Sequence, residues 1–180
     1  MNMAASRFGR MAPHALTVLR LALAPVLFAA ILRGRGDLAA AVLALAMVTD
    51  AVDGPLARRA GVASRAGAWF DVWTDFAVIE AAFGGFAAAG TGPWALPVTS
   101  ALCFALFAVT ARMGPAIHDP VGRHVGGILM VSAFAVVALR DLYVAEAAYL
   151  AAYGALFLTM AARTVFAARL MVGPVRPTAR

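Results

Sequence analysis

The chain has 180 residues, of which 63% are hydrophobic and only 13% are charged, and its mean hydropathy is +0.86. A soluble domain needs more polar surface than this, so the composition predicts a protein that crosses a membrane several times. The formal net charge is +6 and every basic residue is arginine. No basic run is interleaved with aromatic residues, so we expect no nucleic-acid partner.

Six apolar stretches approach the length of about 20 residues that a helix needs to cross a bilayer. The first follows Arg7 and Arg10 and superficially resembles a signal peptide. It is too long for one and contains Arg20, so we expect it to be retained as a membrane span. The predicted spans cover residues 14–32, 38–56, 67–89, 94–111, 123–139 and 143–166, within one domain of residues 1–180.

The placement of the arginines predicts the orientation in the membrane, because arginine-rich connections face the cytoplasm. Both termini are therefore expected inside, with residues 1–12 as a cytoplasmic segment and residues 172–180 as a cytoplasmic tail. The predicted fold is an all-α bundle of six transmembrane helices in a bacterial-type inner or plasma membrane. The cytoplasmic side receives Arg7, Arg10, Arg58, Arg59, Arg65, Arg112, Arg123, Arg169, Arg176 and Arg180, and the opposite side receives Arg33, Arg35 and Arg140.

Four aspartates lie near the cytoplasmic ends of the second and third predicted spans. Asp50 and Asp53 are three residues apart, and Asp71 and Asp75 are four apart, so each pair projects from one helix face. A short connection joins the two spans, so they should pack as an antiparallel pair with the four carboxylates at similar depth. Carboxylates inside a membrane are costly and indicate a functional site.

The chain has no lysine to neutralise these carboxylates. Buried charges must be paired, and divalent cations are the expected partners. Ligation by oxygen alone favours Mg²⁺ or Mn²⁺ over zinc. Two ions bridged by carboxylates suit an in-line displacement at phosphorus, because they stabilise both the attacking and the leaving oxygen.

The segment that holds the four aspartates reads Asp50-x2-Asp53-Gly54-x2-Ala57-Arg58-x8-Gly67-x3-Asp71-x3-Asp75. This spacing resembles the signature of the CDP-alcohol phosphatidyltransferase family, and the six-span layout is also similar to that family. The resemblance implies a homodimeric membrane enzyme of phospholipid biosynthesis. It would move a phosphatidyl group from a CDP-diacylglycerol-type donor to a small alcohol acceptor and release CMP.

The resemblance also implies roles for individual residues. Asp50, Asp53 and Asp71 would hold one metal ion, and Asp50, Asp71 and Asp75 would hold a second. Asp75 would also be the general base that takes the proton from the acceptor hydroxyl. The residues implied to contact the CDP-alcohol are Gly54, Arg58, Ser64, Pro13, His14, Ala15 and Leu16.

The acceptor is expected to be phosphorylated, as glycerol 3-phosphate or inositol phosphate, because arginines suited to phosphate lie near the cytoplasmic ends of the last three spans. These candidates are Arg112, Arg123 and Arg163. They can equally be arginines that set topology and meet lipid phosphates. The chain departs from the family at His14, where asparagine is common. It also has Val72 and Phe76 where phosphatidylglycerophosphate synthases commonly have proline and lysine, which argues against the glycerol-phosphate branch.

Two other functions are compatible with intramembrane carboxylates. An ion-coupled carrier would use them to relay protons or cations, but it gives no reason for the spacing of Gly54, Arg58 and Gly67. A relative that binds CDP-lipid without turnover is the second alternative, and the intact set of four aspartates argues against it.

Overall fold

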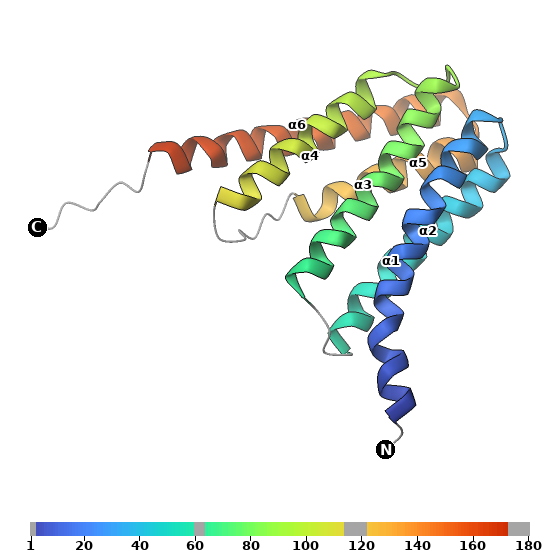
Figure 1. Ribbon diagram of the computed structural model, residues 1–180. Helices are drawn as coiled ribbons and strands as arrows, with labels where there is room; N and C mark the ends of the chain where they lie inside the picture. The colour runs from blue at the N-terminus through green and yellow to red at the C-terminus, as the bar shows by residue number, and fades with distance from the viewer. Residues whose placement is uncertain (1–2, 60–63, 114–121, 173–180) are drawn as a thin grey trace, which may run out of the picture.

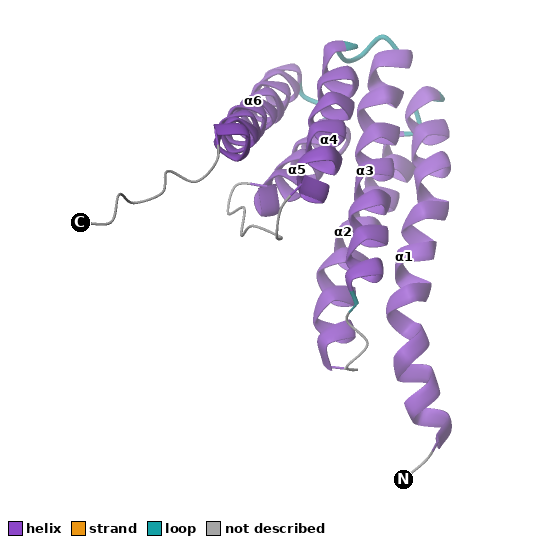
Figure 2. Ribbon diagram, turned by 60° about the vertical axis from the view of Figure 1, so that its left-hand side comes forward, coloured by secondary structure: helices purple, strands orange, loops and turns teal. Residues whose placement is uncertain are grey.

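A computed structural model describes residues 3–59, 64–113 and 122–172, with side chains described for residues 15–52, 64, 66–111 and 124–168. Within these ranges the chain forms six helices and no strand (Figures 1 and 2), which confirms the predicted all-α class. The helices are α1 (Met3–Leu32), α2 (Gly36–Arg59), α3 (Arg65–Ala88), α4 (Ala95–Met113), α5 (Gly122–Leu139) and α6 (Leu142–Val172).

Each predicted span falls on one helix and overhangs that helix by at most one residue, while the helices themselves extend further, as α6 does by six residues at its C-terminal end. The largest difference is at the N-terminus, where α1 begins at Met3 and so includes most of the segment predicted to precede the first span. Hydropathy marks where a helix enters the apolar layer, whereas the helix itself continues as long as its backbone hydrogen bonds do.

Specific capping residues end and start these helices. Gly34 adopts a left-handed φ of 66°, and its N–H donates to the carbonyl of Ile31 while the N–H of Arg35 donates to that of Ala30. This Schellman arrangement needs a residue without a side-chain penalty at positive φ, which glycine supplies. Gly90, with φ of 71°, ends α3 in the same way.

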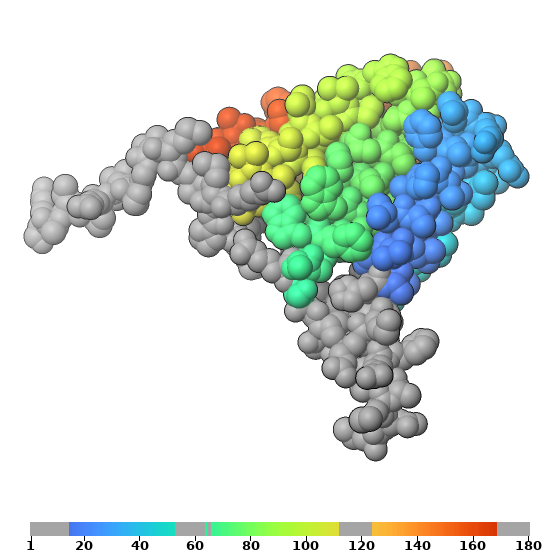
Figure 3. All heavy atoms as spheres, in the orientation of Figure 1, coloured from blue at the N-terminus to red at the C-terminus, as the bar shows by residue number. Residues whose placement is uncertain are grey.

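The helices pack in antiparallel neighbours around one apolar core. α1 contacts α2 and α3, α5 contacts α6 and α2, and α4 contacts α6 and α3. In Figures 1 and 2, α1, α2 and α3 run side by side while α6 diverges from them. Figure 3 shows one face of the molecule, on which α3 lies between α1 and α4. The divergence leaves α3 between two groups of helices, and the site described below lies there.

The turns α1–α2, α3–α4 and α5–α6 gather at one end of the molecule (Figure 1). There Arg140, at the α5–α6 turn, forms an ion pair with Asp37 at the start of α2. Tyr149 of α6 donates a hydrogen bond of 3.0 Å to the carbonyl of Thr91 in the α3–α4 turn. These contacts tie the three turns together across large sequence separations.

Two stretches are long and apolar enough to cross a bilayer by length and composition, namely Ala15–Leu32 and Leu142–Ala168. The helices Ala95–Ala111 and His124–Leu139 are apolar but shorter. The prediction of six spans is therefore supported only in part among the described residues. In α3 the acidic residues Asp71, Asp75 and Glu80 interrupt the apolar run.

Candidate active site

Aspartates from two helices converge at the centre of the molecule. Asp50 of α2 and Asp71 and Asp75 of α3 each offer a carboxylate oxygen, and these oxygens lie within 4.8 Å of one another. The predicted convergence is thus observed for three of the four aspartates. Asp53 lies one turn along α2, with its side chain outside the described residues. The shared face follows from the spacing of three and four residues and from the antiparallel packing of α2 and α3.

A buried arginine from α1 joins the three carboxylates. The guanidinium of Arg20 lies 2.7 Å from Asp50 and 2.5 Å from Asp71, and it also pairs with Asp75. The Arg20 side chain is fully buried, whereas the three carboxylates keep 25–40% of their surface exposed. One face of the acidic cluster is therefore closed by a cation, and the other opens toward the cavity.

This arrangement corrects one sequence-based expectation. The absence of lysine suggested that only metal ions neutralise the carboxylates, but Arg20 supplies a positive charge from the protein itself. The formal charges of Arg20 and the three aspartates sum to −2, and the carboxylates stay partly exposed on the side of the cavity. The cluster therefore attracts cations from that side.

Arg20 is directed at the cluster by the packing of α1. Thr17, Arg20, Ala24, Leu27 and Ile31 are all buried and follow one another at intervals of three and four residues. They form the face that α1 presents to α2 and α3. The sequence does single out Arg20, because an arginine inside an apolar span is rare and usually functional. Its partners lie on two other helices, so they become visible only in the tertiary structure.

The acidic cluster opens into a cavity of about 510 Å³ between α3, α4, α5 and α6. Asp50, Asp71 and Asp75 line it, as do aromatic rings of α3 and α4 and backbone of α5 at Gly126 and Gly127. A side chain at either glycine would meet no atom within 4 Å, so both lie beside open space. The cavity combines a polar, acidic part with apolar walls, as ligand sites in membrane enzymes and soluble proteins commonly do.

Arg163 of α6 lines the same cavity. Its guanidinium lies over the ring of Phe107, 4.7 Å from the centroid, and donates to the hydroxyl of Thr110 at 3.4 Å. These contacts hold a cation in a site that also contains three carboxylates. Arg112, in the last turn of α4, and Arg123, in the first turn of α5, have side chains outside the described residues.

The predicted nucleotide contacts are only partly described. Ser64 caps the N-terminus of α3, where its hydroxyl accepts a hydrogen bond of 3.0 Å from the N–H of Gly67. This gives both residues a structural role in starting the helix that carries Asp71 and Asp75. Ala15 is exposed and Leu16 is half-buried on α1. The side chains of Pro13, His14, Gly54 and Arg58 lie outside the described residues.

The donor set of the cluster fits a hard divalent cation. Every candidate ligand atom is a carboxylate oxygen, and oxygen-only ligation suits Mg²⁺ or Mn²⁺. The partial exposure of the three carboxylates gives such an ion a route from the cavity.

Comparison with known proteins agrees with this geometry. The sequence model of CDP-alcohol phosphatidyltransferases matches residues 10–173, which is most of the chain. A probable phosphatidylglycerophosphate synthase of Mycobacterium tuberculosis, in strains CDC 1551 and H37Rv, is 39% identical over 85 residues. That match covers 44% of this chain and 41% of the relative, so the chain spans less than half the length of the curated relatives it matches. No solved structure matches the chain significantly.

The extent of the family match favours the transferase interpretation over an ion-coupled carrier. The matched residues include most of α1 and all of α2 to α6, and with them the acidic cluster, Arg20 and Arg163. The chain belongs to the CDP-alcohol phosphatidyltransferase family.

Proposed function

We propose that this protein transfers a phosphatidyl group from a CDP-diacylglycerol-type lipid to a phosphorylated alcohol and releases CMP. The observation that carries the proposal is the convergence of Asp50, Asp71 and Asp75 at a cavity that also holds Arg163. Family membership supplies the reaction class. The three carboxylates can hold cations that bind the diphosphate of the donor, and the guanidinium of Arg163 can bind the phosphate of the acceptor.

In the proposed reaction, the acceptor hydroxyl oxygen attacks the lipid-linked phosphorus of the donor. Asp75 takes the hydroxyl proton, a new phosphorus–oxygen bond forms, and the bond from that phosphorus to CMP breaks. Arg20 fixes the orientation of the Asp75 carboxylate through their ion pair, which favours proton transfer along a defined direction. Arg58, from the family signature, is proposed to assist the leaving diphosphate oxygen.

Family members generally depend on divalent metals, and the acidic cluster fits that requirement. We propose two Mg²⁺ or Mn²⁺ ions per site, held by Asp50, Asp53, Asp71 and Asp75. Bound there, they would stabilise the charge on the attacking and leaving oxygens. Gly54, Ser64 and residues 13–16 are proposed to contact the donor nucleotide.

Arg163 supports a phosphorylated acceptor, because guanidinium groups bind phosphate through paired hydrogen bonds. Its contact with Phe107 holds it at the cavity. Arg112 and Arg123 are further candidates for the same phosphate. The name of the Mycobacterium relative refers to phosphatidylglycerophosphate, which puts glycerol 3-phosphate ahead of inositol phosphate as the proposed acceptor.

We further propose that all six helices span a bacterial-type plasma membrane as a homodimer, with both termini and the acidic cluster on the cytoplasmic side. Every helix carries exposed large apolar side chains, from Val18 on α1 to Val165 on α6, as a lipid-facing surface requires. Labelling of single cysteines in a Cys103→Ala background tests the orientation. Ala89→Cys in the α3–α4 turn should react from outside intact cells, and Thr178→Cys in the tail should not.

The activity itself is tested by CMP release from purified protein in detergent. CDP-diacylglycerol and Mg²⁺ or Mn²⁺ are supplied, and glycerol 3-phosphate, inositol phosphate, serine and choline are offered one at a time. Metal-dependent release that one acceptor stimulates supports the transferase and identifies the acceptor. Binding of CDP-diacylglycerol without release for any acceptor would support a non-catalytic relative instead.

A further inference from the structure

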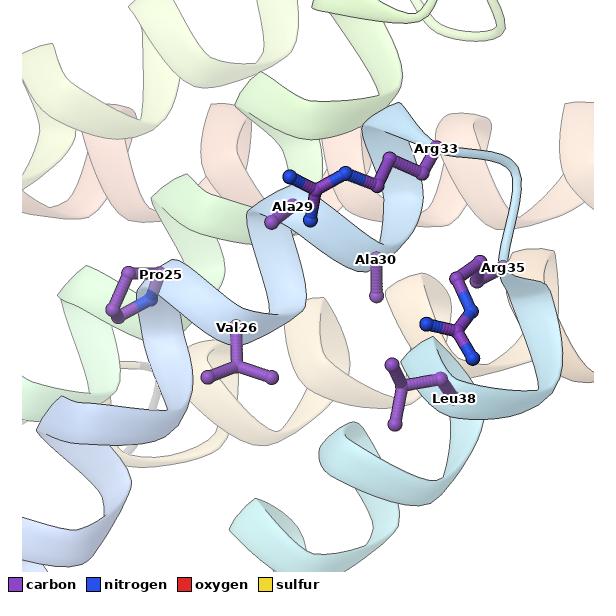
Figure 4. A pocket seen from close by; sticks show the side chains of 7 residues that line it. All are labelled: Pro25, Val26, Ala29, Ala30, Arg33, Arg35 and Leu38. Atoms are coloured by element: carbon purple, nitrogen blue, oxygen red, sulfur yellow. The ribbon is translucent and has the colours of Figure 1, made fainter.

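A shallow groove lies beside the turn between α1 and α2, far from the acidic cluster. It has a volume of about 300 Å³, and Figure 4 shows its lining. Arg33 directly follows the last residue of α1 and is thirteen positions beyond Arg20, so the two residues are about 20 Å apart along the helix axis. The apolar lining comprises chiefly Pro25, Val26, Ala29 and Leu38, and the charged rim comprises Arg33 and Arg35.

The backbone of the turn fixes the two rim arginines relative to the groove. Gly34 stands between them in the left-handed conformation, and the N–H of Arg35 donates to the carbonyl of Ala30 at 2.8 Å. Figure 4 shows the Arg33 side chain lying back along α1 over Ala29. The Arg35 side chain points toward Leu38, so both guanidinium groups border the groove rather than leaving it.

The rim carries positive charge that nearby acids do not neutralise. Asp37, the adjacent carboxylate, is paired with Arg140, whose Nε also donates to the carbonyl of Val137. Among the residues with described side chains, neither Arg33 nor Arg35 lies within ion-pairing distance of a carboxylate. Two guanidinium groups on the rim of one groove, without a carboxylate partner among the described side chains, make that rim attractive to a phosphate.

The apolar part of the groove has the direction and composition of a site for an acyl chain. It extends from Arg33 back to Pro25, eight positions along α1, or about 12 Å. Val26 and Leu38 remain 44% and 38% exposed, although their side chains are apolar. A phosphate at the helix end with apolar surface running inward matches a phospholipid at a membrane interface.

We propose that this groove binds one anionic phospholipid of the leaflet opposite the active site, with its phosphate at the rim formed by Arg33 and Arg35 and an acyl chain along Val26 and Ala29. The site is separate from the donor and acceptor sites and does not depend on the proposed reaction, although it rests on the proposed orientation in the membrane. It would stabilise the tight turn that joins α1, which carries Arg20, to α2, which carries Asp50.

Native mass spectrometry of the purified protein with phosphatidylglycerol, and with phosphatidylcholine of the same acyl chains, tests the proposal. The Arg33→Gln/Arg35→Gln variant should retain phosphatidylglycerol less well, by about fivefold for each arginine. The control Arg176→Gln/Arg180→Gln removes the same charge from the C-terminal tail and should leave binding unchanged. Equal losses in the two variants would mean general attraction to negative charge and would overturn the proposal.

The acyl-chain part is tested with Ala29→Phe, which fills the groove and keeps both arginines. It should weaken phosphatidylglycerol binding, whereas Ala147→Phe, at an exposed position of α6, should not. Thermal unfolding of both variants verifies that they fold. Excess inorganic phosphate should fail to displace the lipid; complete displacement would indicate a site for free anions and contradict the lipid assignment.

Discussion

Arg20 of α1 and Asp50 of α2 are 30 residues apart in the sequence and form an ion pair of 2.7 Å at the centre of the molecule. The same guanidinium reaches Asp71 and Asp75 of α3. One side chain therefore links α1 to the two helices that carry the acidic cluster. In this arrangement Arg20 is both a structural cross-link and the counter-charge that keeps the carboxylates together.

Replacing Arg20 with glutamine should destabilise the protein strongly. The substitution leaves three clustered carboxylates without their buried cation, and removing one partner of a buried ion pair costs about 3–5 kcal/mol. Thermal unfolding in detergent measures the loss. The matched control is Arg140→Gln, which breaks the exposed pair with Asp37 and should cost only a small fraction as much.

Divalent cations should partly rescue the Arg20→Gln variant. The substitution adds one uncompensated negative charge to the site, so Mg²⁺ or Mn²⁺ should raise its unfolding temperature more than that of the unmodified protein. Arg20→Lys keeps the charge and should behave like the unmodified protein in this respect. An equal metal-induced rise in all three proteins would contradict the role of Arg20 as a counter-charge.

Arg163→Gln should raise the KM for the phosphorylated acceptor by about 10- to 100-fold, because a charge-assisted hydrogen bond is worth about 1.5–3 kcal/mol. The KM for the CDP-lipid should change little. Thr110→Val removes the hydroxyl that Arg163 contacts and should produce a smaller effect in the same direction. Initial rates with each substrate varied in turn separate the two KM values. Equal increases in both would argue against acceptor binding by Arg163.

Ser64→Ala should destabilise α3 by about 1 kcal/mol, because the N-cap hydrogen bond to Gly67 is lost. Ser64→Asn retains a capping side chain and should restore most of that stability. The pair also tests the proposed nucleotide contact. If Ser64 touches the donor, the asparagine variant should show a raised KM for CDP-lipid despite normal stability.

Adjacent glycines of α3 should respond differently to alanine. A Cβ at Gly85 would lie 3.2 Å from the Cβ of the buried residue Ile31 on α1, whereas one at Gly84 meets nothing closer than 3.9 Å. Gly85→Ala should therefore destabilise the protein by about 1–3 kcal/mol. Gly84→Ala should be neutral or slightly stabilising, since alanine favours helices. Equal thermal stability of the two variants would contradict the close approach of α1 and α3.

The sequence predicted the helices and the acidic cluster because both depend on local periodicity. Asp50 and Asp71 were placed together from their spacing and from one short connection between two spans. Arg20 was missed as a partner, because its role depends on α1 contacting α2 and α3 simultaneously. A serine just before a helix is a local signal for an N-cap, and Ser64 has it. The family resemblance pointed instead to a nucleotide contact for this residue, so its capping role was not predicted.

The groove at Arg33 and Arg35 could not be predicted from the sequence either. Both arginines were expected only as markers of orientation, because their charge is visible in the sequence but the pairing of Asp37 with Arg140 is not. Asp37 and Arg140 are 103 positions apart. That long-range pair decides which arginines at this end of the molecule remain uncompensated.

We infer that Asp75 is the base of a phosphatidyl transfer reaction, and a comparison of the Asp75→Asn variant with the unmodified protein tests this role. Metal-dependent CMP release and CDP-diacylglycerol binding are measured on both, with the exposed Glu146→Gln as the matched control. We predict that Asp75→Asn binds the lipid but releases CMP at least about 100-fold more slowly, while the control is unaffected. Turnover by Asp75→Asn at the rate of the unmodified protein would contradict the assignment of Asp75 as the base.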